Sequence, residues 1–206
     1  MNPSVDALRA TFGTAIGRAA VARDGETVVC VRAERLRDVM QWLRDTPGER
    51  YDYLVDLTAV EYRDRERPLE VVYFVRSLER RADLRVKVEL DPRGELAVDS
   101  VVPVWAGADW LEREAFDMFG ITFRGHPDLR RILMWETYTE GYPLRKEFPL
   151  RGRFSRAEQV RQALAANPEA HYSLEELSIA EAYDELPADM KERLARGERG
   201  RIEHSE

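Results

Sequence analysis

The sequence "YDYLVDLTAVEYRDRERPLEVVYFVRSLERRADLRVKVEL", residues 51–90, contains three consecutive stretches that predict β-strands. "YDYLVDLTAVEY" and "EVVYFV" are rich in the β-branched and aromatic residues that favour strands. The second is apolar without alternation, which predicts a central strand covered on both faces. "RVKVEL" alternates instead, with Val86, Val88 and Leu90 on one face, so we expect that face to be buried and the other to be solvated. The charged "RDRERP" predicts a turn between strands.

The residues before this stretch predict two helices and a further strand. "SVDALRATFG" begins at Ser4, a residue type that caps helices, and ends at Gly13. "TVVCV", residues 27–31, predicts a strand. "ERLRDVMQWLRD" spaces its apolar residues as one face of a helix, namely Leu36, Val39, Met40 and Leu43. Helices followed by consecutive strands are typical of an α+β fold, with helices packed on a mixed, mostly antiparallel sheet.

The character of the sequence changes after Pro103. "ADWLEREAFDMFG" predicts a helix with Asp109 as its N-cap, Glu112 completing a capping box and Gly120 at its end. Pro, Gly, aromatic and basic residues with little periodicity predict an extended C-terminal arm, and two Ser-x-x-Glu boxes from Ser155 onward predict short helices in a charged tail. We expect the tail to end disordered or ordered only against a partner. The expected organisation is a core domain (residues 1–120), the C-terminal arm (121–152) and the tail (153–206).

Composition excludes several classes of protein. The net charge of −7 argues against nucleic-acid binding, which requires an excess of clustered Lys and Arg. Cys30 is the only cysteine, so this chain has no internal disulfide and no cysteine-held iron–sulfur cluster or zinc site. No apolar run reaches the roughly 18 residues of a membrane span, and no signal pattern occurs at the N-terminus. We therefore expect a soluble chain.

The acids and histidine that follow Trp110 raise the possibility of a chemical site. Glu112, Glu114, Asp117, His126 and Asp128 carry groups that bind metals, but positions 112 and 114 lie roughly 200° apart around a helix and cannot face one ion. No Gly-x-Ser-x-Gly nucleophile elbow is present. One alternative is an independent enzyme that uses Glu114, Asp117 and His126 on a small substrate. The other is that the acids form a solvated or ion-paired helix face.

Charge pairing and aromatic content favour a surface that holds another protein. Arg113 can reach Asp117 one turn later, and the basic residues of the arm can contact the acidic helix. His126 precedes a proline and is therefore expected to be extended. Aromatic residues and arginines, which are enriched at interfaces, are frequent here. The residues expected at a partner interface are Glu112, Arg113, Glu114, Asp117, His126, Asp128, Arg130, Arg131, Arg145 and Lys146.

An arm that packs only on its own domain is the remaining alternative. If the arm holds a partner, Arg130→Ala or Arg131→Ala should weaken docking more than folding, because both residues lie beside the His-Pro-Asp turn.

Four short runs occur in a specific order after residue 110. They are acid-Arg-acid at 112–114, "DMFGI" at 117–121, "GHPDL" at 125–129 and "PLRK" at 143–146. This pattern resembles the signature of one family of NADH-quinone oxidoreductase subunits, the 30 kDa subunit family of respiratory complex I. Looser similarity covers roughly residues 30–150, whereas the final fifty residues do not resemble the commonest tail of the family.

The resemblance implies an α+β subunit of the peripheral arm of a proton-translocating complex that transfers electrons from NADH to quinone. It implies no catalytic residue and no cofactor in this chain, with FMN and iron–sulfur clusters in other subunits. The implied partners are a subunit that resembles the large subunit of nickel–iron hydrogenases and the iron–sulfur subunit of the quinone module, on the cytoplasmic side of the cell membrane. A homologous subunit of a membrane-bound hydrogenase or a related dehydrogenase is the alternative.

Overall fold

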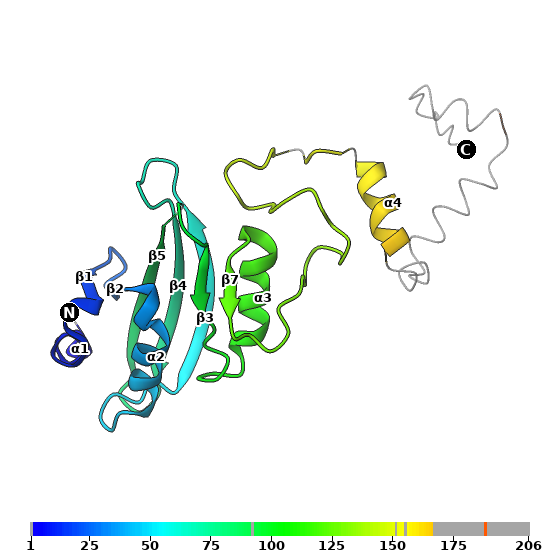
Figure 1. Cartoon of the computed structure of the whole chain (residues 1–206). Coiled ribbons are helices and arrows are strands. Elements are labelled where there is room, and N and C mark those ends of the chain that lie inside the picture. Colours follow the sequence, from blue (N-terminus) through cyan, green and yellow to red (C-terminus); the bar gives the residue numbers. More distant parts are fainter. Residues whose placement is uncertain (1, 92, 151, 155, 167–187, 189–206) are drawn as a thin grey trace, which may run out of the picture. The chain divides into compact units, whose positions relative to one another are not determined.

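The computed structural model describes residues 2–91, 93–150, 152–154, 156–166 and 188 (Figure 1). The chain divides into two compact units, residues 1–154 and residues 155–206. The C-terminal arm therefore belongs to the same unit as the core domain. The only helix with described bounds in the second unit is α4, Arg156–Ala166, which begins inside the first Ser-x-x-Glu box and has Glu158 in its first turn. The second predicted box and the charged end of the tail lie outside the described residues.

A five-stranded sheet forms the centre of the first unit, in the order β1-β2-β5-β4-β3. The β2–β5 pair is parallel and the other three pairs are antiparallel, so the predicted mixed, mostly antiparallel sheet is confirmed. The strands are β1 (Ile16–Val21), β2 (Thr27–Val31), β3 (Tyr53–Glu61), β4 (Leu69–Ser77) and β5 (Ala82–Leu90). β4 and β5 pair without interruption from Leu69 opposite Leu90 to Ser77 opposite Ala82.

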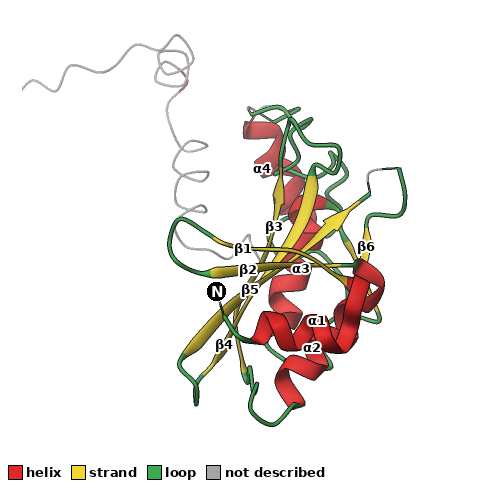
Figure 2. Ribbon diagram, turned by 90° about the vertical axis from the view of Figure 1, so that its left-hand side faces the viewer, coloured by secondary structure: helices red, strands yellow, loops and turns green. Residues whose placement is uncertain are grey.

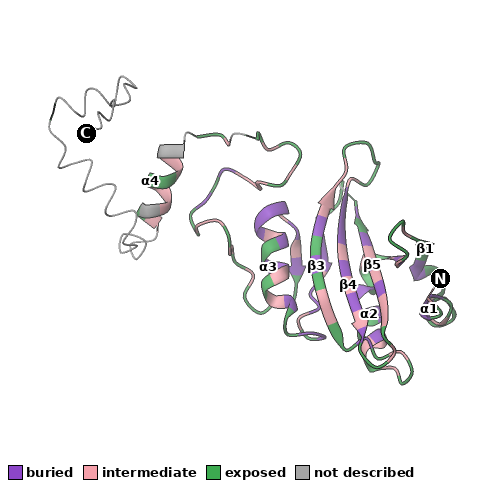
Figure 3. Ribbon diagram, turned by 180° about the vertical axis from the view of Figure 1, so that it is seen from behind, coloured by how far each residue is buried: buried purple, intermediate pink, exposed green. Residues whose placement is uncertain are grey.

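The two faces of this sheet differ in cover. Figure 2 shows α1 (Ser4–Phe12) and α2 (Leu36–Asp45) on one side of the sheet, and Figure 3, from the opposite side of Figure 1, shows β3, β4 and β5 with no described helix in front of them. Side chains on the covered face, such as Tyr73 and Val86, are fully buried. The prediction that β4 is covered on both faces was wrong, because Val72 and Phe74 on its other face stay partly exposed. The alternation predicted for β5 is confirmed.

Both predicted N-terminal helices form, but their starts differ from the prediction. In α2 all four apolar residues at helical spacing are fully buried. In α1 the N-cap is Pro3, and Ser4 is already helical. The Ser4 hydroxyl instead donates to Glu49 Oε2 at 2.5 Å, so the side chain that was expected to cap the helix fixes it to the loop after α2.

Helix α3, Ala108–Phe119, ends at Gly120 as predicted. Two further strands lie on either side of it in sequence, β6 (Ala97–Asp99) and β7 (Thr122–Arg124), and they pair in parallel as a separate small sheet. These short strands and β1 carry no clear alternation and were not predicted. Since β7 pairs with β6, the first residues of the arm are bound to the core rather than extended away from it.

Candidate functional site: helix α3 and the arm that it holds

Asp117 is the centre of the contact between α3 and the C-terminal arm. Its side chain is fully buried. Its Oδ2 accepts three backbone N–H groups, from Ile132 at 3.0 Å, Leu133 at 2.7 Å and Met134 at 2.8 Å. Its Oδ1 accepts from Arg131 Nη1 at 2.5 Å. Charge-assisted bonds of this kind are the strongest hydrogen bonds in proteins, so one carboxylate fixes four consecutive residues of the arm.

The charge on Asp117 is stabilised although the group is out of water. Burial alone raises the pKa of this carboxyl, because it disfavours the charged form. The N–H of Met134, the Arg131 guanidinium and the N–H groups of Ile132 and Leu133 outweigh burial, and together they hold the pKa of Asp117 below its ordinary value. Asp117 is therefore an anion that the arm encloses.

Two arginines complete the attachment of the arm. Arg131 also donates to the carbonyl oxygens of Asp117 at 3.2 Å and Gly141 at 3.3 Å, and its guanidinium lies over the ring of Tyr138 at 5.2 Å. Arg113 donates to the carbonyl oxygens of Arg130 at 3.2 Å and Arg131 at 3.1 Å. The predicted pairing of Arg113 with Asp117 was wrong, because the arm supplies the donors to Asp117 and Arg113 bonds the arm carbonyls instead. The predicted contact between acidic helix and basic arm is present.

Gly120 allows the arm to approach the end of α3. Its φ is +74°, a left-handed conformation that favours glycine. A β-carbon there would also lie 2.6 Å from Cζ of Tyr142, so any other side chain would displace that ring. Nearby, Leu144 N–H donates to the carbonyl of Met118 at 3.1 Å. The run "DMFGI" thus supplies both the carboxylate and the space that the arm needs.

The start of α3 differs from the predicted capping box. Gly107 is the N-cap, and Asp109 lies inside the first turn. Glu112 is fully buried, and its Oε1 accepts the N–H of Val101 at 2.6 Å. Burial raises the pKa of Glu112 to about 7, and bonds from Ser100 and Val101 offset the effect only in part. The interpretation of the acids as a solvated or ion-paired face was therefore wrong for Glu112.

His126 and its neighbours form a turn on the surface of α3. The His126 side chain is enclosed, its Nδ1 accepts the N–H of Asp128 at 3.0 Å, and its Nε2 lies 3.2 Å from the carbonyl of Asp109. Since Nδ1 is an acceptor, the ring proton is on Nε2, which donates to Asp109. Arg130 pairs with Asp128 at 2.8 Å in a solvated position. The "GHPDL" run therefore orients the chain as it leaves β7.

The last two predicted residues contact the edge strand β3. Lys146 N–H donates to Glu61 Oε2 at 2.6 Å, and Arg145 Nε lies 3.8 Å from Glu61 Oε1. The Lys146 side chain itself is exposed, as is Glu114 on α3. Of the ten predicted residues, seven hold the arm or the turn by side-chain contacts with neighbours, Arg113, Asp117, His126, Asp128, Arg130, Arg131 and Arg145.

The residues of the enzyme hypothesis do not converge. Asp117 is enclosed by the arm, the His126 ring is bonded to Asp109 and Asp128, and Glu114 is exposed to solvent. Within the described part of the chain, no three His, Cys, Asp or Glu residues are placed to hold a metal ion. Nor does any described helix have the length and hydropathy that a bilayer span requires.

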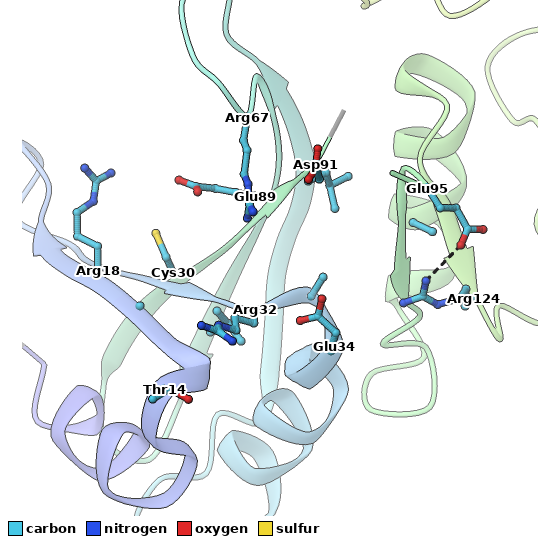
Figure 4. Close-up of a pocket in the computed structure, with 15 residues that line it drawn as sticks. Thr14, Arg18, Cys30, Arg32, Glu34, Arg67, Glu89, Asp91, Glu95 and Arg124 are labelled. Carbon is cyan, nitrogen blue, oxygen red and sulfur yellow. Dashed lines mark ion pairs between the residues drawn. The ribbon is translucent and has the colours of Figure 1, made fainter. Parts of the chain in front are cut away.

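A hollow of about 800 Å³ lies elsewhere on the first unit, beside β1, β2 and β5 (Figure 4). Its walls carry charges of both signs, including Arg18, Arg67 and Glu89, and an ion pair of 3.5 Å between Arg124 and Glu95. None of the ten predicted residues lines it. The predicted surface and this hollow are separate features.

Three large apolar side chains of α3 and the arm are exposed. Trp110 is 66% exposed, Leu133 61% and Leu144 52%. Arg113 extends over the Trp110 ring, with its guanidinium carbon 5.8 Å from the ring centre. Sequence reasoning missed these residues as surface residues, because apolar residues in an amphipathic helix and next to a buried run are normally assigned to the core.

Comparison with known proteins identifies the family of the chain. The sequence model of the respiratory-chain NADH dehydrogenase 30 Kd subunit matches residues 29–154. An NADH-quinone oxidoreductase subunit of Maricaulis maris is 47% identical over 129 residues, 63% of this chain and 63% of that protein. The subunit of the same name from Caulobacter sp. is 50% identical over 128 residues, 62% and 58% respectively, and that from Brucella ovis is 46% identical over 145 residues, 70% of each chain.

Solved structures show the same fold. A trypsin-resistant fragment of Nqo5 aligns with a TM-score of 0.53 and 26% identity, covering 61% of this chain and 96% of the fragment. A chain of an archaeal membrane-bound sulfane sulfur reductase aligns with a TM-score of 0.59 at 21% identity over 71% of this chain and 84% of its own length, and it supports the fold alone. The match spans about three-fifths of the length of the Maricaulis and Caulobacter relatives. The chain belongs to the family of the 30 kDa subunit of respiratory-chain NADH dehydrogenase.

Proposed function

We propose that this chain is a non-catalytic subunit of the peripheral arm of a proton-translocating NADH-quinone oxidoreductase. Its role is to position neighbouring subunits of the quinone module, while electrons pass from NADH to quinone elsewhere in the complex. Membership of the 30 kDa subunit family and the names of the bacterial relatives support this role. FMN and the iron–sulfur clusters reside in other subunits under this proposal.

The geometry of the charged residues supports a structural rather than a chemical role. A general acid or base must reach a substrate proton within hydrogen-bond distance. Asp117 and Arg131 are instead bonded to each other and to the arm backbone, and the His126 ring is enclosed. Each of these groups is already used to hold the chain in shape.

The proposal of a docking surface rests on one observation. The arm, which is mostly irregular, is fixed to α3 and exposes apolar side chains to solvent. Large exposed apolar and aromatic residues near arginines are typical of the energetic centre of an interface. Trp110 and Leu133 have this character. Asp117 holds the backbone at residues 132–134 and Trp110 lies on helix α3, so both side chains are positioned before a partner arrives, which lowers the entropy cost of binding.

Two neighbouring subunits are the proposed partners. One resembles the large subunit of nickel–iron hydrogenases and is called here the hydrogenase-like subunit; the other is the iron–sulfur subunit of the quinone module. The chain is then held at the cytoplasmic side of the cell membrane through the complex. The hydrogenase-like subunit is the proposed occupant of the surface that contains Trp110, Leu133 and Leu144.

The test is affinity purification of the tagged chain from native membranes in mild detergent, with mass spectrometry of the proteins that accompany it. Leu133→Ser should reduce recovery of the hydrogenase-like subunit by at least roughly tenfold, the effect of losing about 1.4 kcal/mol of binding energy. Leu78→Ser is the matched control, because Leu78 is 59% exposed but lies after β4, far from α3 in sequence. Recovery of both partners should be unchanged in this control.

Equal recovery of both partners with the two variants would contradict the docking surface. Recovery of the unaltered chain alone would contradict subunit membership. Hydrogenase subunits in place of NADH-oxidising ones would assign the chain to a related complex.

A further inference from the structure

Glu112 is a carboxyl group that the fold removes from water without fully replacing its hydrogen bonds. Its side chain has no exposed surface. Oε1 accepts the N–H of Val101, whereas Oε2 is buried without a hydrogen-bond partner in the structure. A buried carboxylate with one bonded oxygen is costly, and the usual response is to bind a proton.

The groups that act on Glu112 include one cation, Arg37, and one further acid, Asp109. Tyr73 on β4 is fully buried, its hydroxyl has no partner, and burial followed by the charge of Glu112 raises its pKa well above the ordinary value. Arg37 on α2 is the nearby cation, but it donates to the carbonyl oxygens of Ser100 at 3.1 Å and Arg124 at 3.0 Å. It acts on Glu112 only through space.

Two further acids face this region. Asp109 lies one turn before Glu112 on α3, and its charge disfavours ionisation of Glu112. Asp99 at the end of β6 acts on Tyr73 and is itself paired with Arg124 at 3.0 Å. The Ser100 hydroxyl is the other polar side chain that bonds Glu112.

We propose that the Glu112 carboxyl is a buried proton-binding site whose ionisation weakens the contact between α3 and residues 100–104. In the protonated state the neutral carboxyl fits the apolar surroundings and keeps its bond to Val101. Ionisation releases one proton to solvent and leaves a buried charge that the Ser100 hydroxyl, the N–H of Val101 and the guanidinium of Arg37, which acts through space, do not balance. This property is additional to the proposed role in complex assembly and does not depend on it.

The direction of the pH effect follows from the pKa. Burial raises the pKa of Glu112 from 4.5 to about 7 in the folded chain. The folded chain therefore binds this proton roughly 300-fold more tightly than the unfolded chain does. The resulting stabilisation is fully present below about pH 4.5 and is lost as the pH rises through about 7.

The experiment is a pH titration of the full-length chain labelled with ¹³C at the glutamate side-chain carboxyls, followed by NMR from pH 5 to 9. One carboxyl should titrate near pH 7, and its resonance should be absent in Glu112→Gln. Glu114→Gln is the control, since Glu114 is exposed on the same helix two residues later. The resonance near pH 7 should remain in this control.

Unfolding by urea over the same pH range gives a second measurement. The midpoint should fall with rising pH in the unaltered chain and in Glu114→Gln, and this fall should be smaller in Glu112→Gln. If Glu112→Gln does not fold, Asp109→Asn serves instead, and it should lower the pH at which the carboxyl titrates. The proposal is overturned if no glutamate titrates above about pH 6, if the resonance persists in Glu112→Gln, or if Asp109→Asn leaves the titration unmoved.

Discussion

Helix α3 buries two carboxyl groups, one in each half of the helix, and the comparison between them shows what decides the charge of a buried acid. Asp117 near the C-terminal end receives three backbone N–H groups and an arginine. Glu112 nearer the N-terminal end is bonded by one N–H and by the neutral Ser100 hydroxyl, and its Oε2 has no partner in the structure. Both are fully buried, yet the pKa of Asp117 is lowered and that of Glu112 is raised to about 7.

The difference gives the two ends of the helix opposite responses to pH. The stabilisation from Asp117 is present above its ordinary pKa of 3.8 and is lost as the pH falls through the lower pKa of the folded chain. The stabilisation from Glu112 is lost in the other direction, as the pH rises through about 7. The number of hydrogen-bond donors, rather than burial, therefore sets the charge of each acid. The contact between α3 and the arm should be most stable at neutral and alkaline pH.

Of the substitutions that test this comparison, the one that removes the charge of Asp117 should reduce the free energy of unfolding most. Asp117→Asn keeps the size of the side chain but leaves Arg131 without its counter-ion, and it replaces a charged acceptor for three N–H groups by a neutral one. Breaking a buried pair costs about 3 kcal/mol or more, so we expect a loss of that size in the free energy of unfolding. Urea denaturation monitored by circular dichroism measures it.

Asp128→Asn is the control for that loss, because Asp128 pairs with Arg130 in solvent. Exposed pairs contribute no more than about 1 kcal/mol. A similar loss in both variants would show that Asp117, despite its burial and its three N–H donors, contributes no more to the free energy of unfolding than an exposed acid does.

A side chain at Gly120 should displace the arm from the helix, with a smaller loss of unfolding free energy than Asp117→Asn causes. Gly120→Ala places a methyl group in the left-handed conformation and against the Tyr142 ring, which together should cost about 2 kcal/mol of unfolding free energy. Gly48→Ala shares the positive φ, at +89°, but meets no atom within 4 Å, so it should cost only about 1 kcal/mol. Thermal or urea unfolding distinguishes the two.

The clash itself can be tested by a double variant. In Gly120→Ala combined with Tyr142→Ala, the second substitution should cost less than it does alone, because it relieves the overlap. Strictly additive losses would contradict the close approach as the reason for glycine at this position.

Sequence reasoning succeeded where side chains repeat with a period and failed where a single residue has a partner far along the chain. The alternation in residues 85–90 and the helical spacing from Leu36 to Leu43 depend on one buried face, so β5 and α2 are visible in the sequence. The short β6 and β7 have three residues each, too few for any period to be detected.

The site was found in outline but not in detail for the same reason. The charged runs identified α3 and the arm, and the expectation that they contact each other is confirmed by Asp117 and Arg131. The inward position of Glu112 was not predicted, because an acid three residues after a potential cap is usually part of a capping box. Only the hydrogen bond from the N–H of Val101 shows that Glu112 binds the loop that precedes the helix.

The smallest expected effect concerns Arg130, and it tests the sequence-based expectation that Arg130 and Arg131 both act in docking rather than folding. Arg130 and Asp128 are each 62% exposed, so Arg130→Ala should change the free energy of unfolding by less than about 1 kcal/mol. Arg131 is 15% exposed and bonded to Asp117, so Arg131→Ala should cost clearly more. Urea unfolding of both variants, with recovery of partner subunits measured on the same preparations, separates the two roles. If Arg130→Ala destabilised the chain as much as Arg131→Ala, the division between a solvated turn and an enclosed anchor would be wrong. If Arg130→Ala left folding intact but reduced partner recovery, Arg130 would keep the docking role that the sequence suggested, and only Arg131 would belong to the fold.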